Sequence, residues 1–171
     1  MNDMASKTTI EKFFSMSDEV WARHANPWSV WTRYSCLPLL ALAVWSREWI
    51  GYLSLAPIAL VCLWTWLNPR FFSKPKTTNH WASKAVLGER VWLQHPKDQI
   101  PDHHHRAIRI LNIITFAGFL LAIWGLIQFA IWPTIFGTAI TMIGKSWFLD
   151  RMVWLYQDLK DEKELYRSWY Y

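Results

Sequence analysis

The sequence predicts an all-α protein: a four-helix transmembrane bundle of two hairpins, with amphipathic interfacial helices and a cytoplasmic C-terminal helix extension. Three observations favour this fold class. Hydrophobic residues make up 53% of the 171-residue chain, yet the mean hydropathy is only +0.04, so the apolar residues are concentrated in blocks. The 14 Trp residues exceed ordinary usage, and Trp favours the membrane–water interface. Lys and Arg flank the apolar blocks, as they do on the cytoplasmic side of membrane proteins.

Composition also excludes several classes of protein. The net charge of +5 does not indicate a nucleic-acid partner, because the basic residues flank apolar blocks and form no nucleic-acid-binding motif. Cys36 and Cys62 lie inside apolar runs and are interpreted as small core residues. The first 20 residues carry no apolar core or cleavage site of a signal peptide. The first membrane segment is therefore expected to act as an uncleaved insertion signal.

Residues 1–26 are predicted to form an N-terminal interfacial helix region. Thr8 and Glu11 resemble a capping box, and the apolar residues that follow gather near one face. This pattern is typical of an amphipathic helix, or of two short helices broken near residues 15–17, on a membrane surface.

Residues 27–67 are predicted to form the first transmembrane hairpin. Asn26 and Pro27 are typical of a helix start, and residues 27–46 and 49–67 form two apolar blocks. The 19 residues of the second block suffice to cross a hydrocarbon core of about 30 Å. The fully apolar part of the first block is short, so a re-entrant hairpin that does not cross the membrane stays open as an alternative.

Residues 68–106 are predicted to form a cytoplasmic basic loop with an interfacial helix. Asn68 and Pro69 are expected to end the preceding helix. Asn79 is expected to cap a helix that is interrupted at Gly88 and ends before Pro96.

Residues 107–149 are predicted to form the second transmembrane hairpin. Residues 110–132 contain no charge, and Pro133 is expected to mark the turn. Residues 150–171 are predicted to form the C-terminal helix, as part of one continuous helix from Thr134 to about Arg167.

The distribution of charge predicts the topology. With four spans, both termini and the central loop lie on one side, which holds nearly all Lys and Arg, and Arg47 is the one basic residue on the other. The positive-inside rule makes the basic side cytoplasmic. We therefore expect a multi-pass protein of the inner (plasma) membrane with its N- and C-termini in the cytoplasm.

The ends of the predicted helices on the cytoplasmic side gather polar residues. Arginine side chains can bind an anionic head group through paired N–H donors, so the sequence predicts an anionic or lipid-like ligand there; mutual salt bridging is the alternative. The candidate ligand-binding residues are Arg23, His24, Asn26, Asn68, Arg70, Glu89, Arg90, Asp150 and Arg151.

No metal site or catalytic residue is predicted. Consecutive helical residues point about 100° apart, so His103, His104 and His105 cannot all face one ion. The sequence has no HExxH motif, no Gly-rich phosphate loop and no CxxC. The cofactor, if any, stays unknown.

Other functions stay open. Small residues along the third and fourth spans are consistent with close packing, or with an oligomeric channel or facilitator for a small solute. A membrane-embedded enzyme would use His24 or 103–105 with Glu89 or Asp150, and an accessory subunit of a larger membrane complex is a further alternative. The expected partners are membrane lipid and, in the channel alternative, further copies of the chain as a homo-oligomer.

Four short motifs resemble an uncharacterised family of small polytopic prokaryotic membrane proteins. They are His24-Ala25-Asn26-Pro27-Trp28-Ser29, Leu67-Asn68-Pro69-Arg70, Gly88-Glu89-Arg90-Val91-Trp92 and Asp150-Arg151-Met152-Val153-Trp154. The resemblance implies a compact helical membrane protein of this size. It implies no activity, substrate or cofactor.

Overall fold

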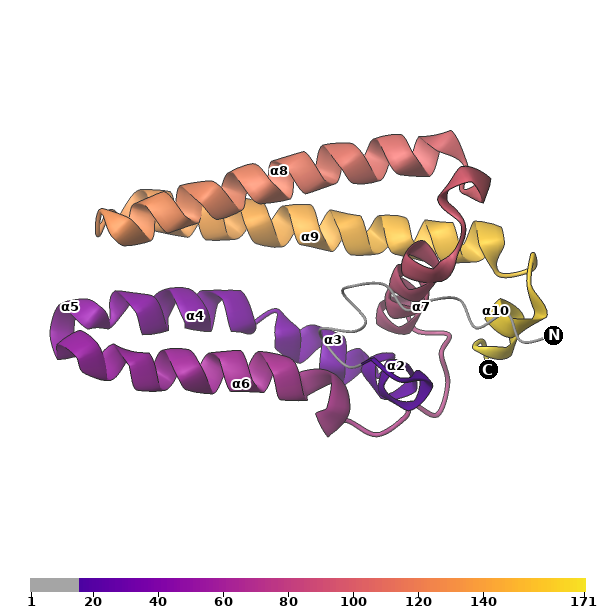
Figure 1. The fold of residues 1–171 in the computed structure, drawn as a ribbon, viewed down its shortest axis with the longest axis horizontal. Coiled ribbons are helices and arrows are strands. Elements are labelled where there is room, and N and C mark those ends of the chain that lie inside the picture. Colours follow the sequence, from indigo (N-terminus) through magenta and orange to yellow (C-terminus); the bar gives the residue numbers. More distant parts are fainter. Residues whose placement is uncertain (1–15) are drawn as a thin grey trace. The chain divides into compact units, whose positions relative to one another are not determined.

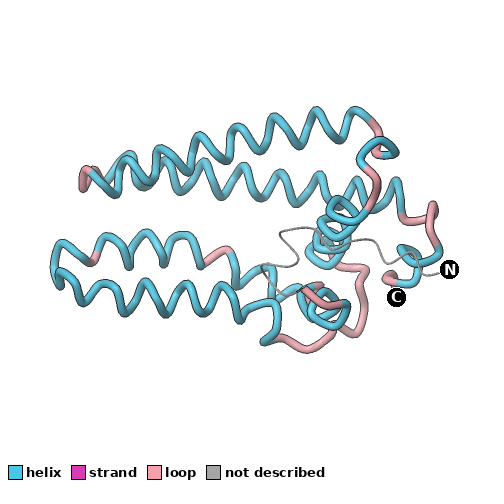
Figure 2. Tube along the Cα trace, viewed as in Figure 1, coloured by secondary structure: helices cyan, strands magenta, loops and turns pink. Residues whose placement is uncertain are grey.

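The structure of the protein is a computed structural model, which describes residues 16–171. Every regular element in this part of the chain is a helix, which confirms the all-α class (Figures 1 and 2). The predicted capping box of Thr8 and Glu11 lies outside the described residues. The helices form two compact units, which are described separately.

Unit 2 comprises Trp31–Asn68 and Arg106–Phe148 and contains two helical hairpins (Figure 1). In the first, the chain passes through short helices and returns along α6. In the second, α8 and α9 run antiparallel. The elements of the two hairpins are α3 (Pro27–Arg33), α4 (Cys36–Trp45), α5 (Arg47–Ile50), η1 (Gly51–Ser54), α6 (Leu55–Phe71), α8 (Asp102–Ile127) and α9 (Ile131–Leu159).

The first hairpin differs from its prediction in two ways. The first apolar block is two helices rather than one, because the chain turns at Tyr34 and Ser35, whose backbone N–H groups bond to Trp31 and Thr32 carbonyls three residues back. The helix α6 continues past Pro69 to Phe71. A proline this close to the end of a helix removes only one backbone hydrogen bond, so the last turn persists.

The turn of the second hairpin lies at residues 128–130, not at Pro133. Phe129 has a φ of 52°, and the N–H of Ala130 bonds to the carbonyl of Gly125 at 2.8 Å. These features form a Schellman C-cap, in which a left-handed residue ends the helix. Pro133 instead lies in the first turn of α9, where its missing N–H costs no hydrogen bond.

Small residues bring α8 and α9 into close contact. A Cβ added to Gly137 would lie 2.2 Å from the backbone nitrogen of Ala122, and one added to Gly144 would lie 2.4 Å from Thr115 Oγ1. Thr115 and Thr141 donate their hydroxyls to carbonyls four residues back in their own helices. Along this stripe the small residues therefore serve packing between the two helices.

Unit 1, described over residues 16–30, 69–105 and 149–171, holds the segments that precede and follow the hairpins in sequence. The helix α2 begins after Ser17, whose Oγ accepts from the N–H of Val20 at 3.2 Å. His80, not Asn79, is the N-cap of α7, and its Nδ1 accepts from the N–H of Ala82. The helical elements of unit 1 are α2 (Asp18–His24), α7 (Trp81–Gln94), η2 (Lys97–Gln99) and α10 (Glu164–Ser168), with the C-terminal end of α9.

The helix α7 is not interrupted at Gly88. A Cβ at this position would lie 1.9 Å from the carbonyl oxygen of Met152, so glycine is what lets α7 touch the backbone of α9. Around this contact, Val86, Val91 and Leu155 are almost completely buried. Gly88 is therefore a packing residue within a continuous helix.

The predicted continuous helix to Arg167 is also corrected, since α9 ends at Leu159 and α10 follows a turn. This reversal buries Tyr166, whose carbonyl accepts the Tyr156 hydroxyl at 2.9 Å. His95 Nδ1 lies 3.1 Å from the Tyr166 hydroxyl. A straight helix would carry Tyr166 away from both contacts.

Two helical stretches, Pro27–Phe71 and Asp102–Ile127, are long and apolar enough to cross a membrane by length and composition.

Candidate functional site

Eight of the nine predicted ligand-binding residues lie in unit 1, and Asn68 lies in unit 2. The structure therefore gathers helix ends that are far apart in sequence into one compact unit. It also gives most of these side chains partners within the protein.

Residues of α2 and of its junction with α3 contact the last turn of α6 and the loop that follows it. The Arg23 guanidinium pairs with Glu19 at 2.7 Å and donates to the carbonyl of Arg70 at 3.3 Å. The Asn26 amide donates to the carbonyl of Ser73 at 2.9 Å, while its Oδ1 accepts from the N–H of Trp28 and caps α3. These contacts hold the two segments together.

Three of the predicted residues are buried, and two of them, His24 and Asn68, have short hydrogen bonds within the protein. His24 Nδ1 lies 3.0 Å from the hydroxyl of Ser29, and both side chains are inaccessible. Asn68, in unit 2, is fully buried and donates to Thr32 Oγ1 at 2.8 Å. Buried polar groups need such partners, and these two bonds account for both residues structurally.

The remaining predicted residues lie on α7 and α9. Arg90 is buried, pairs with Asp18 and stacks on the Trp169 ring, while Glu89 beside it is half-buried. The Asp150 carboxylate accepts from Trp81 Nε1 at 3.1 Å, and the Arg151 guanidinium carbon lies 5.5 Å from the centroid of the Trp154 ring.

A polar pocket of about 370 Å³ in unit 1 brings two lysines to one aromatic ring. The ammonium nitrogens of Lys84, from α7, and Lys160, which follows α9, lie 5.6 and 5.8 Å from the centroid of the Tyr170 ring. Both lysines are half-buried. The pocket is lined by Lys84, Tyr156, Gln157, Asp158, Lys160 and Tyr170, and we call it the lysine pocket.

The C-terminal segment forms a wall of the lysine pocket and is held in place by the loop before α7. The N–H of Thr78 donates to the carbonyl of Tyr171 at 2.8 Å, and the Tyr170 hydroxyl donates to Asn79 Oδ1 at 2.9 Å. In the lining of the pocket, burial raises the pKa of Tyr156 to about 12, so this hydroxyl stays a neutral donor.

A second polar cluster joins the first turn of α8 to α9. His104 Nε2 lies 2.8 Å and His103 Nε2 3.8 Å from Asp158 Oδ2. His105, the third histidine of the triplet, instead bonds through Nε2 to the carbonyl of Lys97 at 2.8 Å. The histidine triplet is thus divided between two sets of contacts.

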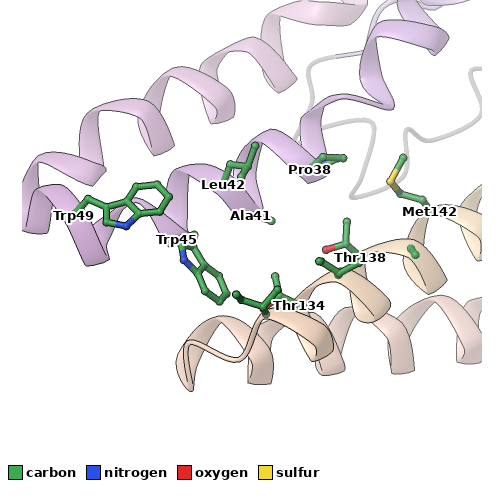
Figure 3. Close-up of a pocket in the computed structure, with 11 residues that line it drawn as sticks. Pro38, Ala41, Leu42, Trp45, Trp49, Thr134, Thr138 and Met142 are labelled. Carbon is green, nitrogen blue, oxygen red and sulfur yellow. The ribbon is translucent and has the colours of Figure 1, made fainter.

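Unit 2 holds an apolar pocket of about 430 Å³ between α4–α5 and α9 (Figure 3). Trp45 and Leu42 lie on one side, and Thr134 and Thr138 on the other. The Oγ1 of Thr138 is buried and has no hydrogen-bond partner among the described residues. The full lining is Pro38, Ala41, Leu42, Trp45, Trp49, Ile131, Thr134, Ile135, Thr138, Ala139 and Met142.

The residues of the lysine pocket and of the histidine cluster escaped the sequence prediction of a ligand site. Lys160 and Tyr170 lay in a segment interpreted as one solvated helix, and only the turn after Leu159 brings them together. Asp158 lies 54 residues from His104 along the chain, so its proximity has no local signal in the sequence.

Comparisons with known proteins assign the chain to a family. A search of curated proteins found no match, and a search of solved structures found none either. One family model matches residues 5–167, nearly the whole chain. This protein therefore belongs to a family of unknown function (DUF6653).

Proposed function

We propose that this chain is a four-span integral membrane protein that binds an anionic head group in the lysine pocket, on the cytoplasmic side of the membrane. The observation that carries the proposal is the position of Lys84 and Lys160. Their ammonium groups lie near the same aromatic ring in the pocket lining, that of Tyr170.

The surface of unit 2 supports a membrane environment. Large apolar side chains in the middle of its long helices are exposed: Leu60 on α6 by 66%, Ile113 on α8 by 63% and Ile143 on α9 by 65%. Exposing such surface to water costs about 25 cal/mol per Å², whereas hydrocarbon removes that cost. Among the residues of unit 2, Glu48 is the only acidic one.

The orientation follows from the basic residues. Arg33, Arg106, Arg109 and Lys145 stand near the ends of the hairpin segments that connect in sequence to unit 1, and Arg47 lies at the opposite turn. By the positive-inside rule, this distribution favours a cytoplasmic location for unit 1 and for both ends of the described chain.

The chemistry of the lysine pocket favours an anion. Two ammonium groups that line one pocket repel each other, and a bound anion offsets this repulsion; half-burial strengthens both effects. The pocket also offers the Gln157 amide, while the Asp158 carboxylate offsets one of the two positive charges. A phosphate group, with several acceptor oxygens, matches this set of donors.

Binding to defined probes tests the proposal. Purified protein is titrated with inorganic phosphate, and nanodisc-embedded protein is compared in phosphatidylglycerol and phosphatidylcholine by native mass spectrometry. The double variant Lys84→Gln/Lys160→Gln is set against Lys76→Gln/Lys163→Gln, which removes the same charge from exposed lysines outside the pocket.

We expect the pocket double variant to lose about tenfold or more in affinity, and the exposed double variant to bind like the wild type. Binding of inorganic phosphate by the wild type identifies a free anion as the ligand. Retention of phosphatidylglycerol in preference to phosphatidylcholine identifies a lipid head group. Equal losses in the two double variants, or no anion binding by the wild type, would overturn the proposal.

A further inference from the structure

We propose that His103, His104 and Asp158 form a binding site for a divalent transition-metal ion such as Zn²⁺. The inference rests on the contacts of two imidazoles with Asp158, whereas the anion proposal rests on Lys84 and Lys160, so either can fail without the other.

The three donor atoms have the spacing of a metal site. One possible ligand atom from each of His103, His104 and Asp158 lies within 4.8 Å of the other two. In a tetrahedral site with metal–ligand distances of about 2.1 Å, ligand atoms are about 3.4 Å apart. The observed separations of 2.8 and 3.8 Å from Asp158 to the two imidazoles lie on either side of that value.

The fold removes the objection that adjacent helical residues diverge. His103 and His104 lie in the first turn of α8, and their ring centroids are only 4.1 Å apart. Only two neighbours need to converge, because His105 contacts Lys97 and the third donor comes from α9. The site is therefore composed of two histidines and one carboxylate from two helices.

Burial makes this cluster different from a surface ion pair. His104 is 1% exposed, and its Nδ1 is buried without a hydrogen-bond partner among the described residues. A buried polar ring usually has partners for both nitrogens. Here the single hydrogen bond of the ring leads to a carboxylate that a second imidazole also approaches.

The donor set indicates the class of ion. Two imidazole nitrogens and one carboxylate oxygen suit Zn²⁺ and neighbouring first-row ions better than Ca²⁺ or Mg²⁺, which prefer oxygen ligands. His103 and Asp158 are exposed, so the side of the ion away from His104 would face solvent and take water as its remaining ligand.

Metal binding by full-length protein without a histidine tag tests the inference. The protein is stripped with a chelator, reloaded with Zn²⁺ or Co²⁺, and measured by elemental analysis and by the ligand-field absorption of Co²⁺. The variants are His103→Ala and Asp158→Asn, which change exposed side chains, and His104→Ala; His105→Ala is the matched control from the same triplet.

We expect one tightly held ion per chain in the wild type and in His105→Ala. The affinity should fall about tenfold or more in His103→Ala and Asp158→Asn, with unfolding curves confirming that both variants are folded. Wild-type protein that takes up no more metal than His103→Ala would overturn the inference and leave an ordinary His–Asp hydrogen bond. Equal metal loss in His105→Ala would do the same, because it would indicate non-specific binding by the triplet.

Discussion

The guanidinium carbon of Arg90 lies 4.0 Å from the centroid of the Trp169 ring. The same guanidinium donates to the carboxylate of Asp18, and the Arg90 side chain is only 8% exposed. One side chain thus connects α2, α7 and the C-terminal segment within unit 1. The candidate ligand-binding arginine is, in this structure, a residue of the framework.

Removing this connection should destabilise the protein without abolishing anion binding. We expect Arg90→Ala to lower the free energy of unfolding by about 1–3 kcal/mol, through lost stacking and packing of the side-chain stem. Arg90→Lys should be intermediate, because an ammonium cannot stack as a guanidinium does. Denaturant unfolding in detergent measures both, and Arg167→Lys, in an exposed pair with Asp161, is the control. Unchanged stability of Arg90→Ala would contradict the framework role.

Two substitutions on α7 should have opposite effects on stability. Gly88→Ala places a methyl group against the Met152 carbonyl, so we expect a loss of about 3 kcal/mol, although Ala is intrinsically the better helix former. Ser83→Ala removes a buried hydroxyl that has no hydrogen-bond partner among the described residues, and should stabilise by about 1 kcal/mol. Thermal unfolding of both variants decides the matter. A more stable Gly88→Ala would show that helix propensity outweighs the contact with α9.

The helical class and the two hairpins were predictable because they depend on local signals. Apolar blocks, the helix start at Asn26 and Pro27, and the basic loop are read from neighbouring residues. The turn at Phe129 was not predictable from the sequence, because a Schellman cap usually has glycine at its left-handed position and here it has phenylalanine. The unbroken α7 was missed for a related reason, since Gly88 serves a tertiary contact and does not end a helix.

The candidate site was less predictable than the fold. The sequence indicated which residues are polar and where helices end, but not which side chains pair. Arg23 and Arg90 were predicted at a ligand site, and the structure gives both of them ion-pair partners within the protein. The lysine pocket depends on the turn after Leu159, which is stabilised by contacts of Tyr166 with residues from other segments.

Arg47, which lies in the first hairpin, should stabilise the end of α8 in the second hairpin. Its guanidinium donates to the carbonyls of Leu126 and Ile127, which have no intrahelical partner at the end of α8, and lies 4.4 Å from the centroid of the Phe129 ring. We expect Arg47→Gln to cost about 1–2 kcal/mol in unfolding free energy. Glu48→Gln, at the neighbouring exposed position, should cost nothing measurable. An equal loss in the two variants would point to a general effect of charge at this turn.

Asp158 should couple the two proposed sites, because it lines the lysine pocket and belongs to the histidine cluster. A metal ion on Asp158 neutralises the carboxylate, so saturating Zn²⁺ should tighten phosphate binding by about fivefold or more. Asp158→Asn should bind phosphate more tightly than the wild type in chelator and lose the response to Zn²⁺. Calorimetric titration with and without Zn²⁺ measures this coupling. The coupling would be excluded if the wild type and Asp158→Asn, each with and without Zn²⁺, all bound phosphate with the same affinity.

The buried His95 should make stability fall in mild acid. Burial is the largest cause lowering the pKa of His95 from 6.5; Lys163 and Lys97 act in the same direction, and Glu162 and Asp98 oppose it. The folded protein therefore keeps His95 neutral, bonded to the Tyr166 hydroxyl, at pH values where the unfolded chain already binds a proton. By linkage, its contribution is complete above pH 6.5 and declines as the pH falls from there towards the folded-state pKa.

Unfolding free energies at about pH 7.5 and 5.5, measured in chelator, should differ more for the wild type than for His95→Gln, which cannot titrate. His80→Asn, an exposed substitution that retains a capping side chain for α7, should keep the wild-type difference. If His95→Gln retained the full wild-type dependence on pH, the proton would be taken up elsewhere, and the His95–Tyr166 contact would have no part in the acid sensitivity of unit 1.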